Sequence, residues 1–334
     1  VEFQADSMLE IIDKYAFSKS SIKKISFPPS LKRICKCAFE NCDNLYQFEI
    51  PENSELQTID KFAFQFSSIS SLTIPSNLTD LKEGWCGYTN HLYSIKVMPN
   101  NKKYSYLDQQ LILEKSNPES NNYDTIVFAN RYISKVTIPN FIKEIKAYAF
   151  ENCKLLQHVI IPSDSQLKKI GNSAFSSSPI QHIHIPPHIT EIDEFAFASC
   201  SDLLYFEIPK NVKLNKLSNC LFFSSGIQQI KLSSYVTGIG KSTFSNCHQL
   251  QRIEFPIDSK LKKIGELAFI HSSITSISIP SSVTEICNNA FYGCDHLTKI
   301  EFSDDSELQI IGSSAFSNTL IENIKIISHV TEIG

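Results

Sequence analysis

The sequence predicts an α/β repeat solenoid, in which about 12–13 coils each add one short strand to a stack of parallel β-strands. Three observations predict this fold. An Ala-Phe pair, degraded in places, recurs at steps that alternate between 22 and 25 residues. A short segment with apolar residues at alternate positions recurs with the same period. Finally, Gly is sparse with 10 residues while Phe is frequent with 23, which indicates a patterned core.

The Ala-Phe marker runs through almost the whole chain. Its Phe positions are Phe17, Phe39, Phe64, Phe150, Phe175, Phe197, Phe222, Phe244, Phe269, Phe291 and Phe316. In the gap after Phe64, residues 81–86 align with residues 145–150, which places Cys86 at a Phe position. One coil cannot bury its own apolar face, so we expect the Phe side chains of stacked coils to form a continuous buried column.

The alternating segments predict the strands. In residues 250–256, Ile253 and Phe255 alternate with polar residues before Pro256, which has no N–H to donate and ends the strand. A fixed period brings the next strand parallel to it. Thirteen strands are expected, starting near Ile22, Leu45, Ile69, Leu92, Ile133, Leu156, Ile180, Leu203, Ile227, Leu250, Ile274, Leu297 and Ile321.

One coil departs from the pattern, because residues 99–132 replace its outer part. Two apolar runs, residues 110–113 and 125–128, flank the polar residues 116–122, which predicts an inserted β-hairpin. We otherwise expect residues 1–334 to form a single solenoid. Because the chain begins without Met and ends inside a repeat, we expect that solenoid to be truncated at both ends.

Two stretches of the chain carry a family resemblance. Their pattern residues are Cys294, Leu297, Ile300 and Phe302 in residues 294–302, and Ile279, Pro280, Val283, Ile286, Ala290 and Phe291 in residues 279–291. They resemble the BspA-like leucine-rich repeats, whose unit runs approximately C-x-x-L-x-x-I-x-I-P and then I-x-x-x-A-F. The resemblance covers essentially the whole chain and implies a leucine-rich-repeat fold. It also implies a cell-surface or secreted protein of a microbe or protozoan parasite that binds host or matrix proteins.

Composition and motifs argue against several functions. The net charge of −4 and the pI near 6.2 give no overall attraction to nucleic acid or anionic membranes, and no run of about 18 apolar residues predicts membrane insertion. Nucleophile-elbow, zincin, dinucleotide-binding and P-loop motifs do not occur. We therefore expect no enzyme and no cofactor. Six basic residues near the start favour a solvated face, with a phosphate or sulfated-glycan contact as the alternative: Lys19, Lys23, Lys24, Lys32, Arg33 and Lys36.

Half of the ten cysteines hold one repeat position, which recurs in every second coil: Cys42, Cys153, Cys200, Cys247 and Cys294. Two coils separate them by about 9.6 Å, beyond the roughly 7 Å Cα limit for a disulfide. Alternate coils have Ser there, so we expect buried free thiols in a place that needs a small side chain. Cys35 and Cys37 raise the alternative of a zinc site, but no second pair stands at ligand spacing.

The alternation also predicts which side chains leave the sheet and meet a partner. The candidate partner-binding residues are His158, His182, His184, Tyr205, Glu207, Gln229, Lys231, Arg252 and Glu254. Glu207, Lys231 and Glu254 should form cross-strand ion pairs. His158 and His182 should be neighbours about 4.8 Å apart. The three histidines suggest a metal site or pH-sensitive partner binding, with ordinary exposed polar residues as the alternative.

These features lead to one expected function and one alternative. The first is a non-enzymatic recognition or adhesion module that binds a protein or glycan on a host cell or matrix through the exposed sheet. The alternative is an intracellular scaffold for protein–protein interaction. Many unpaired cysteines favour the scaffold, and so does the presence of a single N-glycosylation sequon at Asn77.

Overall fold

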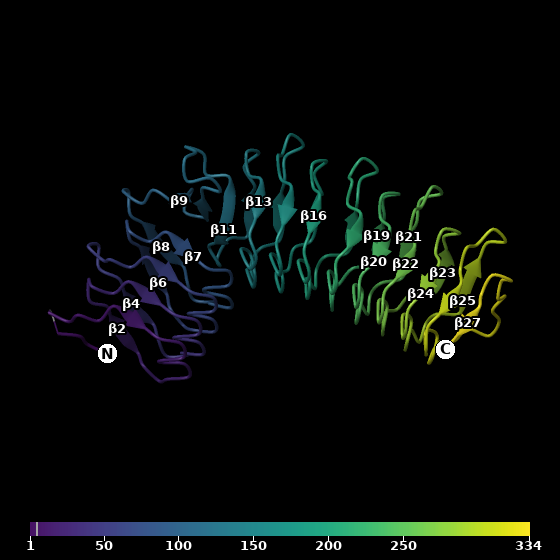
Figure 1. Ribbon diagram of the computed structural model, residues 1–334, viewed down its shortest axis with the longest axis horizontal. Helices are drawn as coiled ribbons and strands as arrows, with labels where there is room; N and C mark the ends of the chain where they lie inside the picture. The colour runs from purple at the N-terminus through teal and green to yellow at the C-terminus, as the bar shows by residue number, and fades with distance from the viewer. Residues whose placement is uncertain (5) are drawn as a thin grey trace. The chain divides into compact units, whose positions relative to one another are not determined.

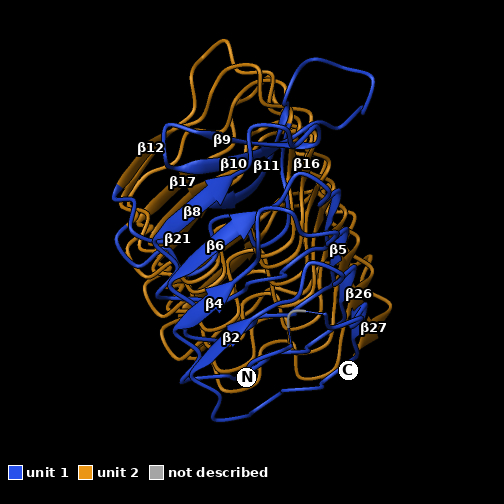
Figure 2. Cartoon of the chain, turned by 90° about the vertical axis from the view of Figure 1, so that its left-hand side faces the viewer, with its two compact units in different colours: residues 1–134, 144–155 blue, residues 135–143, 156–334 orange. Residues whose placement is uncertain are grey.

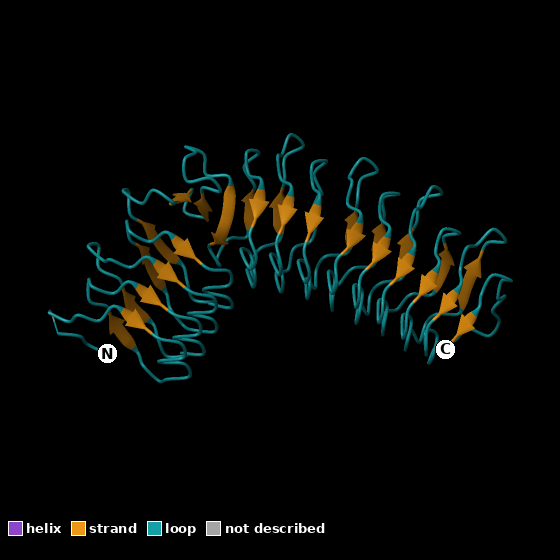
Figure 3. Ribbon diagram, in the orientation of Figure 1, coloured by secondary structure: helices purple, strands orange, loops and turns teal. Residues whose placement is uncertain are grey.

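The computed structural model describes residues 1–4 and 6–334, so of the predicted solenoid only Ala5 lies outside the described residues. The described residues form short strands and turns, without any helix (Figure 3). The stack of parallel strands is thus confirmed, whereas the helical part of the α/β expectation is not. No helix among the described residues is long and apolar enough to cross a membrane.

The chain divides into two compact units: unit 1, residues 1–134 and 144–155, and unit 2, residues 135–143 and 156–334 (Figure 2). In both units each coil contributes up to two strands. We call those at the expected alternating segments the front strands, and the two-residue strands that follow them the back strands. Sequence reasoning missed the back strands, because one inward apolar residue per strand leaves no alternation to detect.

In unit 1 the front strands are β2 (Lys24–Ser26), β4 (Gln47–Glu49), β6 (Ser71–Ile74) and β8 (Ser94–Val97). Its back strands are β1 (Ile11–Ile12), β3 (Arg33–Ile34), β5 (Thr58–Ile59), β7 (Asp80–Leu81) and β13 (Glu144–Ile145). Figure 1 shows β2, β4, β6 and β8 following one another along the unit.

In unit 2 the front strands are β12 (Lys135–Thr137), β14 (His158–Ile160), β17 (Tyr205–Glu207), β19 (Gln229–Lys231), β21 (Arg252–Glu254), β23 (Ser276–Ile279) and β25 (Lys299–Phe302). Its back strands are β15 (Lys169–Ile170), β16 (Glu191–Ile192), β18 (Lys216–Leu217), β20 (Gly238–Ile239), β22 (Lys263–Ile264), β24 (Glu285–Ile286), β26 (Ile310–Ile311) and β27 (Glu332–Ile333).

Eleven of the thirteen expected front strands form. The segment after Ile180 makes only an isolated bridge, between His182 and His158, and the segment after Ile321 is not assigned as a strand. The pairing of back strands preserves the predicted period: Lys216 pairs with Gly238 and Gly238 with Lys263, steps of 22 and 25 residues. The alternation of two coil lengths is confirmed.

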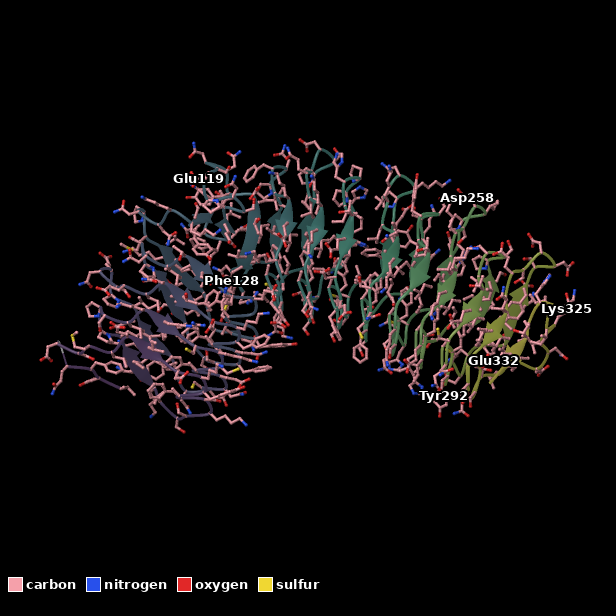
Figure 4. The ribbon with its side chains drawn as sticks, in the orientation of Figure 1. Glu119, Phe128, Asp258, Tyr292, Lys325 and Glu332 are labelled. Atoms are coloured by element: carbon pink, nitrogen blue, oxygen red, sulfur yellow. The ribbon has the colours of Figure 1, made fainter. Side chains whose placement is uncertain are left out.

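Left-handed residues explain the missing helices. Between a back strand and the next front strand the chain makes the Ala-Phe turn, which two residues with positive φ flank, such as Leu267 (φ 58°) and His271 (φ 55°). A left-handed residue other than Gly costs roughly 1–2 kcal/mol and breaks a right-handed helix. The pair recurs in coil after coil, so the return segment turns and never becomes helical. Tyr292, in one such turn, and Asp258 lie at opposite edges of unit 2 (Figure 4).

The Phe column is confirmed in both units. In unit 2 the rings of Phe175, Phe197, Phe222, Phe244, Phe269, Phe291 and Phe316 stack one on the next, with centroids 4.9–5.9 Å apart. In unit 1 Phe39 stacks on Phe17 at 5.2 Å and on Phe64 at 5.4 Å. Backbone bonds follow the same stack, since the Phe175 N–H donates to the carbonyl of Ala196 at 2.9 Å.

The insert forms three antiparallel strands, β9 (Tyr104–Leu107), β10 (Leu111–Glu114) and β11 (Thr125–Ala129). The expected hairpin is β10 and β11, and β9 is an addition. β11 also pairs in parallel with β13, so it serves as the back strand of its coil. Glu119, in the loop after β10, lies at the outer edge of unit 1, away from the strands (Figure 4).

Buried polar contacts fix the insert to unit 1. The carboxylate of Glu114 forms an ion pair with Lys146, outside the insert, and another with Lys103, within it, at 2.9 Å. The hydroxyl of Tyr104 accepts a hydrogen bond from the Leu81 N–H at 2.9 Å, which satisfies a donor of back strand β7. The strands of the insert are therefore part of the packed core, and its outer loop is the exposed part.

Candidate functional site

The candidate site lies on the front face of unit 2, which we define as the outward side chains of its front strands. Within β17, Phe206 is buried while Tyr205 and Glu207 point outward, because side chains alternate along a strand. The same pattern holds along the neighbouring strands. The outward residues include these predicted ones: His158, Tyr205, Glu207, Gln229, Lys231, Arg252 and Glu254. Their role in binding a partner stays a prediction.

The register of these strands confirms the expected neighbours. Tyr205 pairs with Gln229 and Gln229 with Arg252, while Glu207 pairs with Lys231 and Lys231 with Glu254. Two parallel rows of side chains therefore cross the front face. Within each row, successive side chains are one strand spacing apart.

Ion pairing among these residues is only partly as expected. Lys231 binds Glu207 at 3.1 Å, as predicted. Glu254, however, forms an ion pair with Arg252 in its own strand, at 3.1 Å, and accepts a hydrogen bond from Gln229 in the neighbouring strand, at 2.7 Å. Lys231 therefore pairs with Glu207 and not, as also predicted, with Glu254. The long Arg252 side chain reaches Glu254 within one strand and takes the place of Lys231.

These contacts shift the titration of the charged side chains. The hydrogen bond from Lys231 holds the pKa of Glu207 below its usual value, and the same contact raises the pKa of Lys231. Desolvation, and then the charge of Glu207, raises the pKa of Tyr205, whose hydroxyl donates to that carboxylate at 3.2 Å. Tyr205, Glu207 and Lys231 thus form one connected group that fixes the orientation of an aromatic ring 40% exposed to solvent.

The histidines lie beside this group. His158 and His182 are bridge partners in adjacent coils, as predicted, and His182 and His184 alternate with the buried Ile183. All three imidazoles are exposed. Within the described part of the chain, no group of three His, Cys, Asp or Glu side chains is placed to hold a metal ion. The metal hypothesis therefore has no geometric support, while the pH-sensitive one stays a prediction.

Sequence reasoning also missed a groove over the back strands of unit 2. It has a volume of about 640 Å³ and crosses strands β18 to β27, with Lys216, Lys263 and Glu285 along it. A side chain at Gly238 would meet nothing within 4 Å, so packing alone does not require that glycine. The unusual Gly at an outward position is the signal that was available. Lys263 and Glu285 pair with each other at 2.9 Å.

A buried polar cluster, also missed, lies inside unit 1 beside the insert. Arg131 is 4% exposed, lies over the ring of Phe128 at 4.3 Å and donates to the Ala149 carbonyl at 3.1 Å. Burial raises the pKa of Glu151 to about 7, although the nearby Arg131 charge lowers it. Arg131 Nε, Glu151 Oε2 and Asn152 Oδ1 are buried without a hydrogen-bond partner. This arrangement bears on stability.

Among the residues that the structure describes, no cysteines are grouped where they could hold a metal ion. None of the ten, all of which lie within the described residues, is assigned to a disulfide, and Cys35 and Cys37 are buried in unit 1. Burial raises the pKa of both thiols, which disfavours the thiolate that zinc binds.

The geometry is that of a repeat scaffold: stacked parallel strands, a stacked Phe column and an exposed sheet. The model of the BspA-type leucine-rich repeat region, in six copies, matches residues 1–109, 122–225 and 215–334. The chain therefore belongs to the BspA-type leucine-rich-repeat family. Among curated proteins, none matches the chain.

Solved structures show the same fold. A leucine-rich cell surface protein of Faecalibacterium prausnitzii is similar at 26% identity and a TM-score of 0.64, over 72% of this chain and 62% of that protein. The chain thus spans less than two thirds of that relative. A leucine-rich-repeat protein of Eubacterium ventriosum matches at 20% identity and a TM-score of 0.69, over 95% of this chain and 82% of the other. The pneumococcal vaccine antigen PcpA matches at 20% identity and a TM-score of 0.67, over 96% of this chain and 73% of that protein.

Proposed function

We propose that the protein is a non-enzymatic recognition module that binds a protein or glycan of a host cell or matrix through the front face of unit 2. The observation that carries the proposal is the connected, exposed group of Tyr205, Glu207 and Lys231, next to the exposed Arg252. Tyr and Arg are the side chains that most often dominate binding energy at interfaces. Here strand pairing holds them in fixed register, which lowers the entropy lost on binding.

The surroundings support a binding surface of mixed character. Ile160 and Leu204 are exposed by 42% and 41%, and they bring apolar area beside the histidines and Tyr205. An interface commonly combines such apolar area with a polar rim. The similarity at 26% identity to a leucine-rich cell surface protein supports display at the cell surface.

The test is binding of the purified chain to cultured epithelial cells and to immobilised matrix proteins. A variant with Tyr205→Ala and Arg252→Ala removes the proposed anchors. The matched control is Tyr46→Ala with Lys24→Ala, which removes an exposed aromatic ring and the cation 5.9 Å above it in unit 1. We expect saturable binding that weakens by roughly a thousandfold in the first variant, because anchors of this kind contribute about 2 kcal/mol each and every 1.4 kcal/mol is tenfold in affinity. The control should bind like the parent.

Equal binding by parent and Tyr205/Arg252 variant would contradict the proposal, and so would an equal loss in the control.

A second candidate function is an intracellular scaffold, which the ten cysteines without an assigned disulfide favour, because the cysteines of exported proteins are commonly oxidised to disulfides. Labelling of intact and permeabilised cells with an antibody against the chain separates the two functions. Labelling only after permeabilisation favours the scaffold.

A further inference from the structure

The front face of unit 2 has a depression between β21 and β23. These strands belong to successive coils and contact each other, yet they are assigned to separate ladders, one of β17, β19 and β21 and the other of β23 and β25. The depression has a volume of about 720 Å³ and is lined by residues 251–255 and 275–278. Its floor is low because the outward residues of β23 are two exposed serines, Ser276 and Ser278.

Each of these serines lies between two side chains of the same charge, and the sign of that charge differs between the two serines. Ser276 pairs in register with Lys299 and holds the repeat position of Arg252 in the preceding coil. Ser276 therefore lies in a row between two cations. Ser278 pairs with Glu301 and holds the repeat position of Glu254, so the second row places it between two carboxylates.

The flanking charges are available to a partner, although each has a neighbour. Arg252 binds Glu254 at 3.1 Å and Lys299 binds Glu301 at 2.6 Å, and the Arg252 and Lys299 side chains remain 70% and 66% exposed. Exposed pairs of this kind contribute roughly 0–1 kcal/mol, so a partner can compete for them at little cost. They hold the charges at the rim of the depression in the free protein.

The two rows lie two residues apart along β23, about 6.7 Å at 3.3–3.4 Å per residue. The same distance separates side chains i and i+2 of any extended chain, and these side chains point to the same side. An extended peptide on β23 can therefore place one side chain over each serine. The lining contains a single aromatic ring, that of the half-buried Phe255, so the depression has no exposed ring on which a sugar can stack.

We propose that this depression, the notch, binds an extended segment of a protein partner that carries an acidic and a basic side chain two residues apart. The acidic side chain lies over Ser276 between Arg252 and Lys299. The basic one lies over Ser278 between Glu254 and Glu301. The inference rests on the proposed function of the front face and names the kind of segment that the face recognises.

Fluorescein-labelled peptides test the notch without knowledge of the natural partner. The probe is a Thr-based peptide of about nine residues with Asp and Lys two positions apart, and its control has the same composition with the two residues three positions apart, which puts them on opposite sides. We expect the probe to bind the full chain about tenfold tighter by fluorescence anisotropy at low salt. The preference should shrink at about 0.5 M salt, because salt screens exposed charges.

Two matched variants control for the surface itself. Ser276→Trp fills the notch, while Ser71→Trp adds the same ring at the same repeat position in β6, where the register neighbour is the uncharged Ser94. Ser276→Trp should abolish the preference for the probe, and Ser71→Trp should leave it intact. The proposal would be overturned if the two peptides bound equally, or if Ser276→Trp left the preference for the probe unchanged.

Cell binding separates this inference from the proposed function. If Tyr205→Ala with Arg252→Ala abolishes cell binding while Ser276→Trp leaves it unchanged, the notch is wrong and the front face remains the binding surface. If the probe shows its spacing preference while the chain binds neither cells nor matrix proteins, the notch is supported and adhesion is not.

Discussion

The Cys and Ser residues that alternate along the repeat meet one local requirement, a small buried polar side chain at the contact between neighbouring coils. The thiols of Cys247 and Cys294 donate to the carbonyl oxygens of Phe222 and Phe269, each at 3.0 Å. The Ser225 hydroxyl lies 3.6 Å from the Cys247 sulfur. The buried, small side chain expected at this position is therefore confirmed for Ser225, Cys247 and Cys294.

Burial should make these thiols inert in the folded protein. It raises the pKa of Cys200 and Cys247 to about 12, so on the order of one molecule in ten thousand carries the thiolate at pH 8. We expect neither cysteine to be alkylated by iodoacetamide in the native state, and both to be alkylated in denaturant, as peptide mass spectrometry can measure. Rapid native alkylation at either position would contradict the buried geometry.

Glu151 should make stability depend on pH. Its folded pKa of about 7 lies above the ordinary 4.5, so the folded protein keeps a proton that the unfolded chain has lost between these pH values. The stabilisation is complete below about pH 4.5 and is lost as pH rises through 7, by up to roughly 3 kcal/mol. Glu151→Gln should remove this loss, so the variant gains on the parent as pH rises from 4.5 to 8 in urea melts.

The matched control is Glu83→Gln, whose exposed carboxylate pairs with Lys61. Its stability relative to the parent should vary by less than about 1 kcal/mol over the same pH range. A Glu151→Gln variant that loses stability at pH 8 would show that the ionised carboxylate is favourable there.

At the scale of elements, the front strands could be predicted and the back strands could not. Alternation over four to six residues fixes both the position and the outward face of a front strand, as in β23. A back strand such as β20 has two residues and one buried side chain, Ile239, so no period exists to be read. The left-handed residues that exclude helices are equally hidden, because many of them, such as Phe195 and Leu267, are not residue types that favour positive φ.

The Phe column should dominate stability at this scale. Phe197 is fully buried and stacks between Phe175, at 5.5 Å, and Phe222, at 5.9 Å. Phe197→Ala should lower the free energy of unfolding by about 3–5 kcal/mol in denaturant melts, because it opens a cavity between three coils. Phe195→Ala is the control, since Phe195 is 37% exposed two residues away and should cost less than about 1 kcal/mol. Similar losses in both variants would contradict the column.

At the scale of the whole molecule, the repeat motif carried the resemblance to the family and the repeat period predicted the outward residues, but neither predicted the contacts that those residues make. The rows of Tyr205, Gln229 and Arg252, and of Glu207, Lys231 and Glu254, are fixed by the period and confirmed by the register. Whether Glu254 pairs with Arg252 or with Lys231 depends on the length and the exposure of these side chains. The depression between β21 and β23 exists because these two strands belong to separate ladders. No pattern in the sequence predicts that break.

Blocking the front face of unit 2 with a polymer tests the central claim most directly. Gln229→Cys places a thiol in the middle of the face, and Thr58→Cys places one on back strand β5 of unit 1, as a control. The native cysteines should react only slowly with maleimide, because burial raises the pKa even of the half-buried Cys287 to about 11. After coupling to maleimide-polyethylene glycol, the chain carrying polymer at Gln229→Cys should lose saturable binding to cells and matrix proteins. The chain modified at Thr58→Cys should keep it. Binding that survives polymer at the front face would contradict the account.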